Sequence, residues 1–150
     1  MLNTVFYALL MLLAGLGIPV MAALNSGLGI RLQSPAIAAS LLFFVGLAAS
    51  LLYLFVVEGI PKTFPFIKMP WYFYCGGILI AFYVLSITYI APYLGITNAI
   101  TFILLGQLIA MSAIDHYGLM NVTQYTFTTQ RLLGLILMCV GVFLLLNKSE

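Results

Sequence analysis

The hydrophobic pattern divides the chain into five long apolar segments separated by shorter polar ones. A membrane-spanning helix needs about 20 predominantly apolar residues, and all five segments reach or approach that length. The pattern therefore predicts an all-α fold of five transmembrane helices, over residues of about 4–24, 35–57, 70–90, 95–114 and 129–146. The last helix is the shortest, and the polar, threonine-rich stretch between Asp115 and Arg131 is not expected to form a sixth.

Local residues support several of these boundaries. Ser34 is a good N-cap residue, and Pro35 suits the first position of the second helix. Pro70 opens the third helix in the same way, and Gly118 marks the end of the fourth.

Composition identifies the solvent in which these helices lie. Of the 150 residues, 65% are hydrophobic and only 5% are charged, whereas soluble domains carry about 25% charged residues. So few charges cannot cover a water-exposed surface. We therefore expect one polytopic transmembrane domain over residues 1–150, with the lipid bilayer as its surroundings.

The basic residues give almost no preferred orientation. Lys62, Lys68 and Arg131 are expected on the side of the N-terminus, and Arg31 and Lys148 on the other side. The excess of one favours a cytoplasmic N-terminus only weakly. The chain therefore either has one weakly specified orientation or inserts in both, and the near balance favours dual insertion and an antiparallel pair.

A few polar side chains lie within the apolar segments, where they are candidates to line a substrate cavity. The expected cavity residues are Asn25, Tyr83, Asn98, Thr101 and Gln107. Successive helical residues rotate by about 100°, so Asn98 and Gln107 are expected on opposite faces of the fourth helix. Gln107 either contacts a neighbouring helix or lies in the substrate path.

Asp115 and His116 are expected where the fourth helix leaves the bilayer. A protonated His stabilises a helix C-terminus and an Asp does not, so Asp115 is expected to have a specific partner, either Arg131 or His116. The pair either fixes this helix end or takes part in proton coupling.

Several classes of function are not supported. No acidic residue lies in the middle of a predicted helix, so exchange built on a central carboxylate is not expected. With one His and no nucleophile–base or phosphate-loop motif, we expect no enzyme, no metal site and no cofactor. The net charge of +2 gives no reason to expect nucleic-acid binding.

Small residues recur on several helices and favour close helix packing. Gly15, Pro19, Ala23 and Gly27 form one stripe on the first helix. The glycines expected at helix contacts elsewhere are Gly76, Gly77, Gly118, Gly134 and Gly141.

Four stretches together resemble a known family. They are Asn25 followed by SPAIAASLLFFVG, PWYFYCGGILIAFYV, the APYLG turn at residues 91–95, and GQLIAMSAIDHYGL followed by RLLGLILMCVGVFLLL. Over its whole length the chain resembles the YdcZ family of five-helix inner-membrane exporters, a branch of the drug/metabolite transporter superfamily. The residues that match the family pattern are Asn25, Gly76, Gly77, Gln107, Asp115, His116 and Gly118.

The resemblance implies a fold similar to one half of a ten-helix transporter. It also implies pairing with a second copy, or with a paralogue, in the opposite orientation. The chain departs from the pattern at Met21, where the family often has glutamine, and at Leu79 and Ile80, where a further glycine is common.

These observations predict a secondary transporter of the inner membrane that exports a small metabolite or drug-like solute by alternating access as an antiparallel homodimer. A small dual-topology channel and an accessory membrane subunit are the alternatives. The substrate, the coupling ion and the direction of transport do not follow from the sequence.

Overall fold

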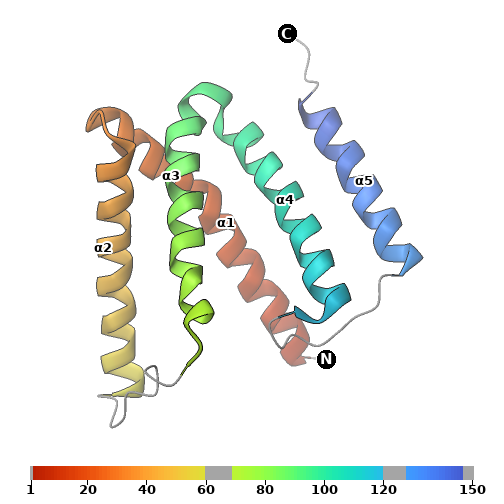
Figure 1. Ribbon diagram of the computed structural model, residues 1–150, viewed down its shortest axis with the longest axis horizontal. Coiled ribbons are helices and arrows are strands. Elements are labelled where there is room, and N and C mark those ends of the chain that lie inside the picture. Colours follow the sequence, from red (N-terminus) through yellow and green to blue (C-terminus); the bar gives the residue numbers. More distant parts are fainter. Residues whose placement is uncertain (1, 60–68, 120–127, 147–150) are drawn as a thin grey trace. The chain divides into compact units, whose positions relative to one another are not determined.

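The computed structural model describes residues 2–59, 69–119 and 128–146. Figure 1 shows α-helices throughout, with these bounds: α1 (Leu2–Arg31), α2 (Pro35–Tyr53), α3 (Gly76–Leu94), α4 (Ile96–Tyr117) and α5 (Thr129–Leu146). A π-helical segment, η1 (Leu54–Glu58), follows α2, and a 3₁₀ segment, η3 (Trp71–Cys75), precedes α3. The predicted all-α class is confirmed.

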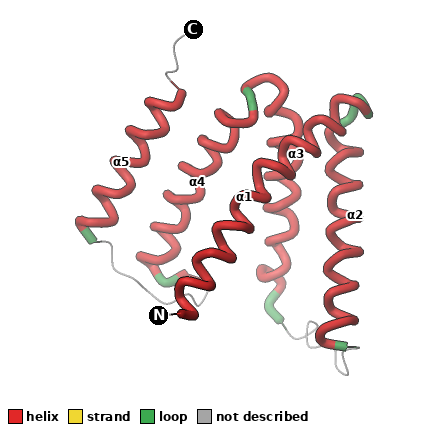
Figure 2. The backbone as a smooth tube through the Cα atoms, turned by 180° about the vertical axis from the view of Figure 1, so that it is seen from behind, coloured by secondary structure: helices red, strands yellow, loops and turns green. Residues whose placement is uncertain are grey.

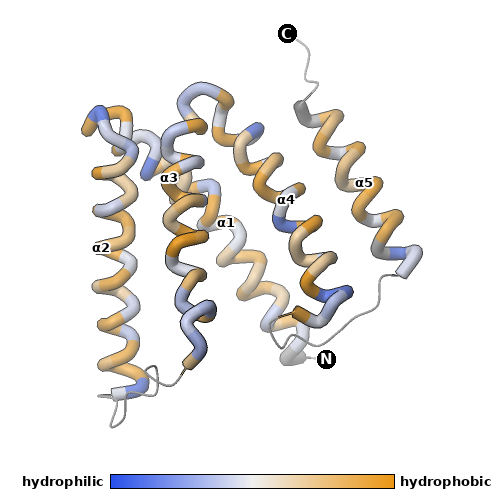
Figure 3. Tube along the Cα trace, viewed as in Figure 1, coloured by the Kyte–Doolittle hydropathy of each residue, from blue (hydrophilic) through white to orange (hydrophobic). Residues whose placement is uncertain are grey.

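Four of the helical stretches are long and apolar enough to cross a bilayer, namely Thr4–Arg31, Pro35–Glu58, Trp71–Leu94 and Ile96–Tyr117. In α5 the apolar stretch is shorter, Leu132–Leu144. In the most apolar 18-residue stretch of each of the four, at most 17% of the residues are buried. Figure 3 shows apolar residues along most of each helix, and such extensive apolar exposure is typical of lipid-facing helices.

The chain divides into two compact units, Met1–Tyr93 and Leu94–Glu150. The first contains α1, α2 and α3, and the second contains α4 and α5. Within the units, α1 contacts α2 and α4 contacts α5. Figure 2 shows α4 and α5 side by side. The expectation of one transmembrane domain over residues 1–150 stays a prediction.

Small side chains form most of the core of the first unit. The fully or nearly fully buried residues there include Ala22 on α1, Ala38 and Ala39 on α2, and Val84 and Ala91 on α3. Helices in lipid associate through close packing rather than through hydrophobic burial, and small residues permit that approach. The sequence of these faces therefore explains why the three helices associate.

At Gly29 this approach is closest. A Cβ added there would lie 3.0 Å from Cγ2 of Thr88, 3.6 Å from Cα of Pro35 and 3.7 Å from Cβ of Ala38. A side chain at this position would therefore require the Thr88 methyl group to shift.

The corner between α1 and α2 is compact because one residue serves both helices. The N–H of Ser34 donates to the carbonyl of Gly29 at 3.0 Å and that of Gln33 donates to Ile30 at 3.1 Å, which is the Schellman pattern of a helix C-terminus. The Ser34 hydroxyl then accepts a hydrogen bond of 3.2 Å from the N–H of Ile37, at the start of α2. The predicted N-cap at Ser34 and the proline at the first position are confirmed.

Gln33 occupies the left-handed position of this corner, with φ of 52°. Glycine is usual there, because a side chain in this conformation costs about 1 kcal/mol or more. Among the described residues it is the one non-glycine with positive φ.

Three predicted helix ends were wrong. The first helix was expected to end near Leu24, but α1 continues to Arg31. Asn25 therefore lies inside the helix. The stretch at residues 91–95 was expected to be a turn, but α3 continues through Pro92 to Leu94. Only Gly95, with φ of 84°, separates α3 from α4.

The fourth helix was expected to end near Ile114, but α4 continues to Tyr117, and Gly118 marks its end as expected. Gly118 adopts the left-handed conformation, with φ of 59° and ψ of 36°, directly after Tyr117. A glycine at this position satisfies the last carbonyl groups without steric cost, so Asp115 and His116 lie in the last turn of α4.

Candidate functional site

The first unit contains a buried polar pair between α1 and α3. The side-chain amide of Asn25 donates a hydrogen bond of 2.6 Å to the hydroxyl of Thr88. Asn25 is 4% exposed and Thr88 is 1% exposed. In an apolar environment each group needs a partner, and each supplies one to the other. The bond therefore fixes the position of Asn25 at the face of a pocket.

That pocket lies between α1 and α2 and has a volume of about 310 Å³. It is lined by Met21, Leu24, Asn25, Leu28, Leu41, Leu42 and Val45. Among the described residues that line it, Asn25 is the only polar one. The pocket can hold an apolar group of about this volume and offer it one amide.

Tyr83, on α3, has a buried hydroxyl with no hydrogen-bond partner among the described residues. An unpaired buried hydroxyl is costly. A bound solute that supplies a partner would remove this cost, which keeps Tyr83 as a candidate contact residue.

In the second unit, two of the candidate cavity residues donate to backbone carbonyls four residues earlier, one at the end of α3 and one within α4. The Asn98 amide donates to the carbonyl of Leu94 at 3.1 Å, and the Thr101 hydroxyl donates to the carbonyl of Thr97 at 2.7 Å. Thr101 is buried and Asn98 is half-buried. The side-chain oxygen of Asn98 and the second N–H of its amide remain available for another group.

Gln107 is exposed and lies on the opposite face of α4 from Asn98, because the helix is continuous between them. The five candidate cavity residues thus divide between the units, with Asn25 and Tyr83 in the first and the other three in the second. Their joint role in one cavity stays a prediction.

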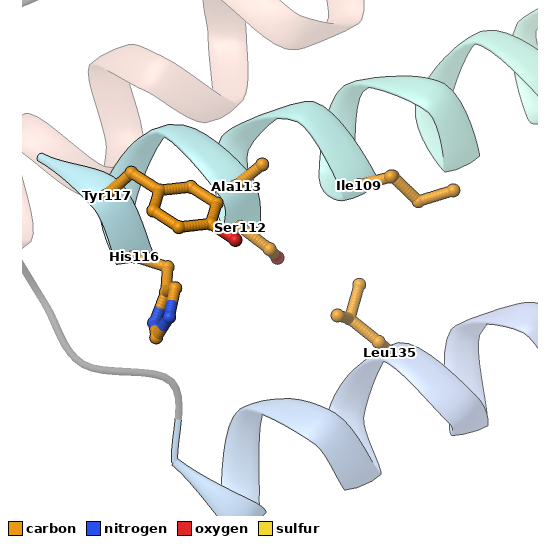
Figure 4. Close-up of a pocket in the computed structure, with 6 residues that line it drawn as sticks. All are labelled: Ile109, Ser112, Ala113, His116, Tyr117 and Leu135. Carbon is orange, nitrogen blue, oxygen red and sulfur yellow. The ribbon is translucent and has the colours of Figure 1, made fainter. Parts of the chain in front are cut away.

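A second pocket, of about 430 Å³, lies between α4 and α5 within the second unit. Figure 4 shows the residues that line it, which are Ile109, Ser112, Ala113, His116 and Tyr117 on α4 and Leu135 on α5. The rings of His116 and Tyr117 meet edge to face, with centroids 4.9 Å apart and planes at 75°. This pocket therefore places an imidazole, a phenol and a serine hydroxyl along an otherwise apolar wall.

Sequence reasoning identified His116 but missed Ser112 and Leu135. The i, i+4 spacing of Ser112 and His116 puts both on one helical face, and that spacing could have identified Ser112. Leu135 has no comparable local pattern, because it reaches the pocket from another helix.

Asp115 and His116 are both half-buried in the last turn of α4. Asp115 does not line the pocket that contains His116. The side chain of Arg131, the expected partner of Asp115, lies outside the described residues, as do Lys62, Lys68 and Lys148.

Most of the glycines expected at helix contacts have open space around them. A Cβ added at Gly76, Gly77, Gly134 or Gly141 would meet no described heavy atom within 4 Å, and the same holds for Gly15 and Gly27 on the predicted stripe of α1. The packing face of α1 instead contains Ala22, Asn25 and Gly29. Among the described residues of one chain, no neighbouring atom therefore packs closely against these glycines.

Comparison with known proteins identifies the family of this chain. Residues 6–144 match the family model described as "Putative inner membrane exporter, YdcZ". Neither the comparison with curated proteins nor the comparison with solved structures finds a match. The matched range includes both pockets, the Asn25–Thr88 pair and all of α1 to α4 from Phe6 onward. The chain is therefore a multi-pass protein of the inner membrane and belongs to the YdcZ exporter family.

Proposed function

We propose that this protein is a secondary transporter that exports a small solute across the inner membrane by alternating access. The family match over residues 6–144 is the observation that carries this proposal. The buried Asn25–Thr88 pair supports it, because polar groups within membrane helices are costly and are commonly functional.

The proposed cavity contains Asn25, Tyr83, Asn98, Thr101 and Gln107. These side chains offer amides and hydroxyls but no charge. Of the acidic residues in the described part of the chain, Glu58 ends η1 and Asp115 lies in the last turn of α4, so neither is at the middle of a span. A solute without net charge, either neutral or zwitterionic, fits such a lining best.

The proposed working unit is an antiparallel pair of chains. Many secondary transporters bind substrate between two inverted halves, and one chain here corresponds to one half. The open glycines Gly76, Gly77, Gly134 and Gly141 provide smooth helix surfaces for a second copy.

Transport can be tested without knowing the substrate. Proteoliposomes are loaded with a small-molecule extract of the host cells, and the loss of each compound from the lumen is followed by mass spectrometry. For the depleted compound, the proposal requires saturable flux that external substrate accelerates. Rapid, non-saturating flux would favour the channel, and no depletion relative to empty liposomes would favour the accessory subunit.

The two native cysteines test the orientation of the pair. Cys75 lies at the start of the third span, and Cys139 lies near the middle of α5. At a rise of about 1.5 Å per residue, antiparallel copies hold their Cys75 thiols near opposite membrane surfaces, while their Cys139 thiols share a depth. A short bis-maleimide should therefore never link Cys75 to Cys75. Such a product, checked in a Cys139→Ser variant, would show a parallel dimer.

A further inference from the structure

The corner between α1 and α2 forms one side of a third pocket, of about 300 Å³, that lies wholly within the first unit. Its polar lining comes from Gln33 at the corner and from Thr88, Tyr89 and Tyr93 on α3. Ile30 and Pro92 are among its apolar walls. The volume is at the lower end of the range of about 300–1,000 Å³ found for small-molecule sites.

The floor of this pocket is fixed before any ligand arrives. Thr88 is held by its hydrogen bond from Asn25, and its methyl group lies against Gly29. The Schellman bonds of Gln33 and Ser34 fix the corner itself. A preformed site binds with little loss of conformational entropy.

The conformation of Gln33 is an observation independent of the pocket. Its φ of 52° is one that glycine adopts without steric cost, yet the chain places a long amide side chain there. Residues held in such conformations tend to cluster at ligand-binding sites. Here the strained residue is also one that lines the pocket.

The two tyrosines define the opposite wall. Tyr89 and Tyr93 lie one turn apart on α3, with ring centroids 5.5 Å apart and planes at 55°. Tyr89 is 58% exposed and Tyr93 is 78% exposed, so both rings are accessible to a ligand. Aromatic side chains of this kind pack on the apolar part of a ligand while their hydroxyls form hydrogen bonds.

The lining indicates the chemistry of the ligand. None of the described residues around the pocket is charged, and amides and hydroxyls alone do not compensate for the desolvation of a full charge. We infer that the corner pocket binds an uncharged, hydroxyl-bearing amphipathic molecule, with the Gln33 amide bonding to its hydroxyl and Tyr89 and Tyr93 packing on its apolar part. Such a molecule could come from the bilayer, as a neutral monoacyl lipid, or from water, as a small glycoside.

Two probes distinguish these sources in the full-length protein reconstituted in nanodiscs. A monoacylglycerol with a photoactivatable diazirine reports the lipid source, and its attachment sites are mapped by mass spectrometry. Phenyl β-glucoside reports the aqueous source through its ability to reduce that labelling. The inference expects labelling near Tyr89 and Tyr93, and suppression by the glucoside would identify a water-borne ligand as the better occupant.

Gln33→Gly is the decisive variant, because it removes the amide and relieves the backbone at the same time. We expect roughly fivefold weaker labelling, the value of one hydrogen bond, together with an unchanged or higher melting temperature. Gln33→Asn keeps an amide and tolerates the same φ, so it should retain more labelling than Gln33→Gly. Tyr53→Leu, an exposed tyrosine of α2 outside the pocket, is the matched control and should match the parent.

The inference is overturned if neither probe labels or competes in the parent protein. It is also overturned if Gln33→Gly labels as strongly as the parent, or if Tyr89→Leu combined with Tyr93→Leu leaves labelling unchanged. None of these outcomes depends on transport, so they leave the proposed export function to its own test.

Discussion

Asn25 and Thr88 are 63 residues apart in the sequence and 2.6 Å apart in the fold. Their bond joins α1 to α3. Hydrogen bonds between membrane helices contribute about 0.6 kcal/mol on average and about 1.7 kcal/mol at most.

Thr88→Val keeps the shape of the side chain but removes the acceptor of that bond. We expect it to lower the free energy of unfolding by about 1 kcal/mol, measured by denaturation in mixed micelles. Thr88→Ser retains the hydroxyl and should lose less. In a double-mutant cycle with Asn25→Leu, a coupling energy near zero would show that the bond does not stabilise the fold.

Gly29→Ala tests the closest approach of the helices. The added methyl group would lie 3.0 Å from Cγ2 of Thr88, and overpacking of this kind costs roughly 1–3 kcal/mol. We expect a loss of about 1 kcal/mol. Gly17→Ala on the same helix is the control, because its Cβ would meet no described atom within 4 Å. Equal stability of the two variants would contradict the packing described at Gly29.

Ser34→Ala removes the N-cap of α2. The hydroxyl accepts from Ile37 N–H at 3.2 Å, and loss of such a cap costs about 1 kcal/mol. Hydrogen exchange at Ile37 should accelerate in the variant. Ser40→Ala is a suitable comparison, because its hydroxyl bonds only to the carbonyl of Ala36 within its own helix. If exchange at Ile37 is the same in both variants, the cap is not a stabilising interaction.

The near balance of basic residues should make the orientation easy to change. Arg31→Gln leaves three basic residues against one, so C-terminal reporter fusions should shift toward the orientation with a cytoplasmic N-terminus. Lys62→Gln with Lys68→Gln leaves one against two and should shift the fusions the other way. Dual insertion is contradicted if the parent and both variants give one identical orientation.

Asp115 lies at a helix C-terminus, where a negative charge is unfavourable with respect to the helix dipole. We expect that Asp115 instead fixes that helix end through its contact with a specific partner. In that case Asp115→Asn changes stability but leaves the pH profile of transport unchanged, as measured by flux in proteoliposomes between pH 6 and 8 (roughly the range over which histidine titrates). A flattened pH profile would instead assign proton coupling to this residue.

Much of the fold could be predicted because lipid imposes a simple rule on helix length. The starts at Pro35 and Thr129 and the end at Gly118 agree with the sequence. At Pro35 and Gly118 the reason is local, because serine and proline favour a helix start and glycine favours a helix end. The extension of α1 to Arg31 was missed because Asn25, Ser26 and Gly27 resemble a turn. In the fold Asn25 and Ser26 are buried on a packed face, so tertiary contacts outweigh their local preference.

The candidate sites were less predictable than the helices. Asn25 could be identified as a polar residue in an apolar segment, but Thr88 could not be assigned as its partner, because no local pattern links residues so far apart. Gln33 was missed for another reason: its importance depends on a backbone angle that the residue type itself disfavours.

Ser34 closes α1 with its N–H and opens α2 with its hydroxyl, so no flexible linker separates the two helices. In a conformational cycle, the α1–α2 corner would therefore move as one rigid body. Any widening of the pocket lined by Asn25 must then come from bending of the helices or from side-chain rotation, and not from a change of angle at the corner between α1 and α2.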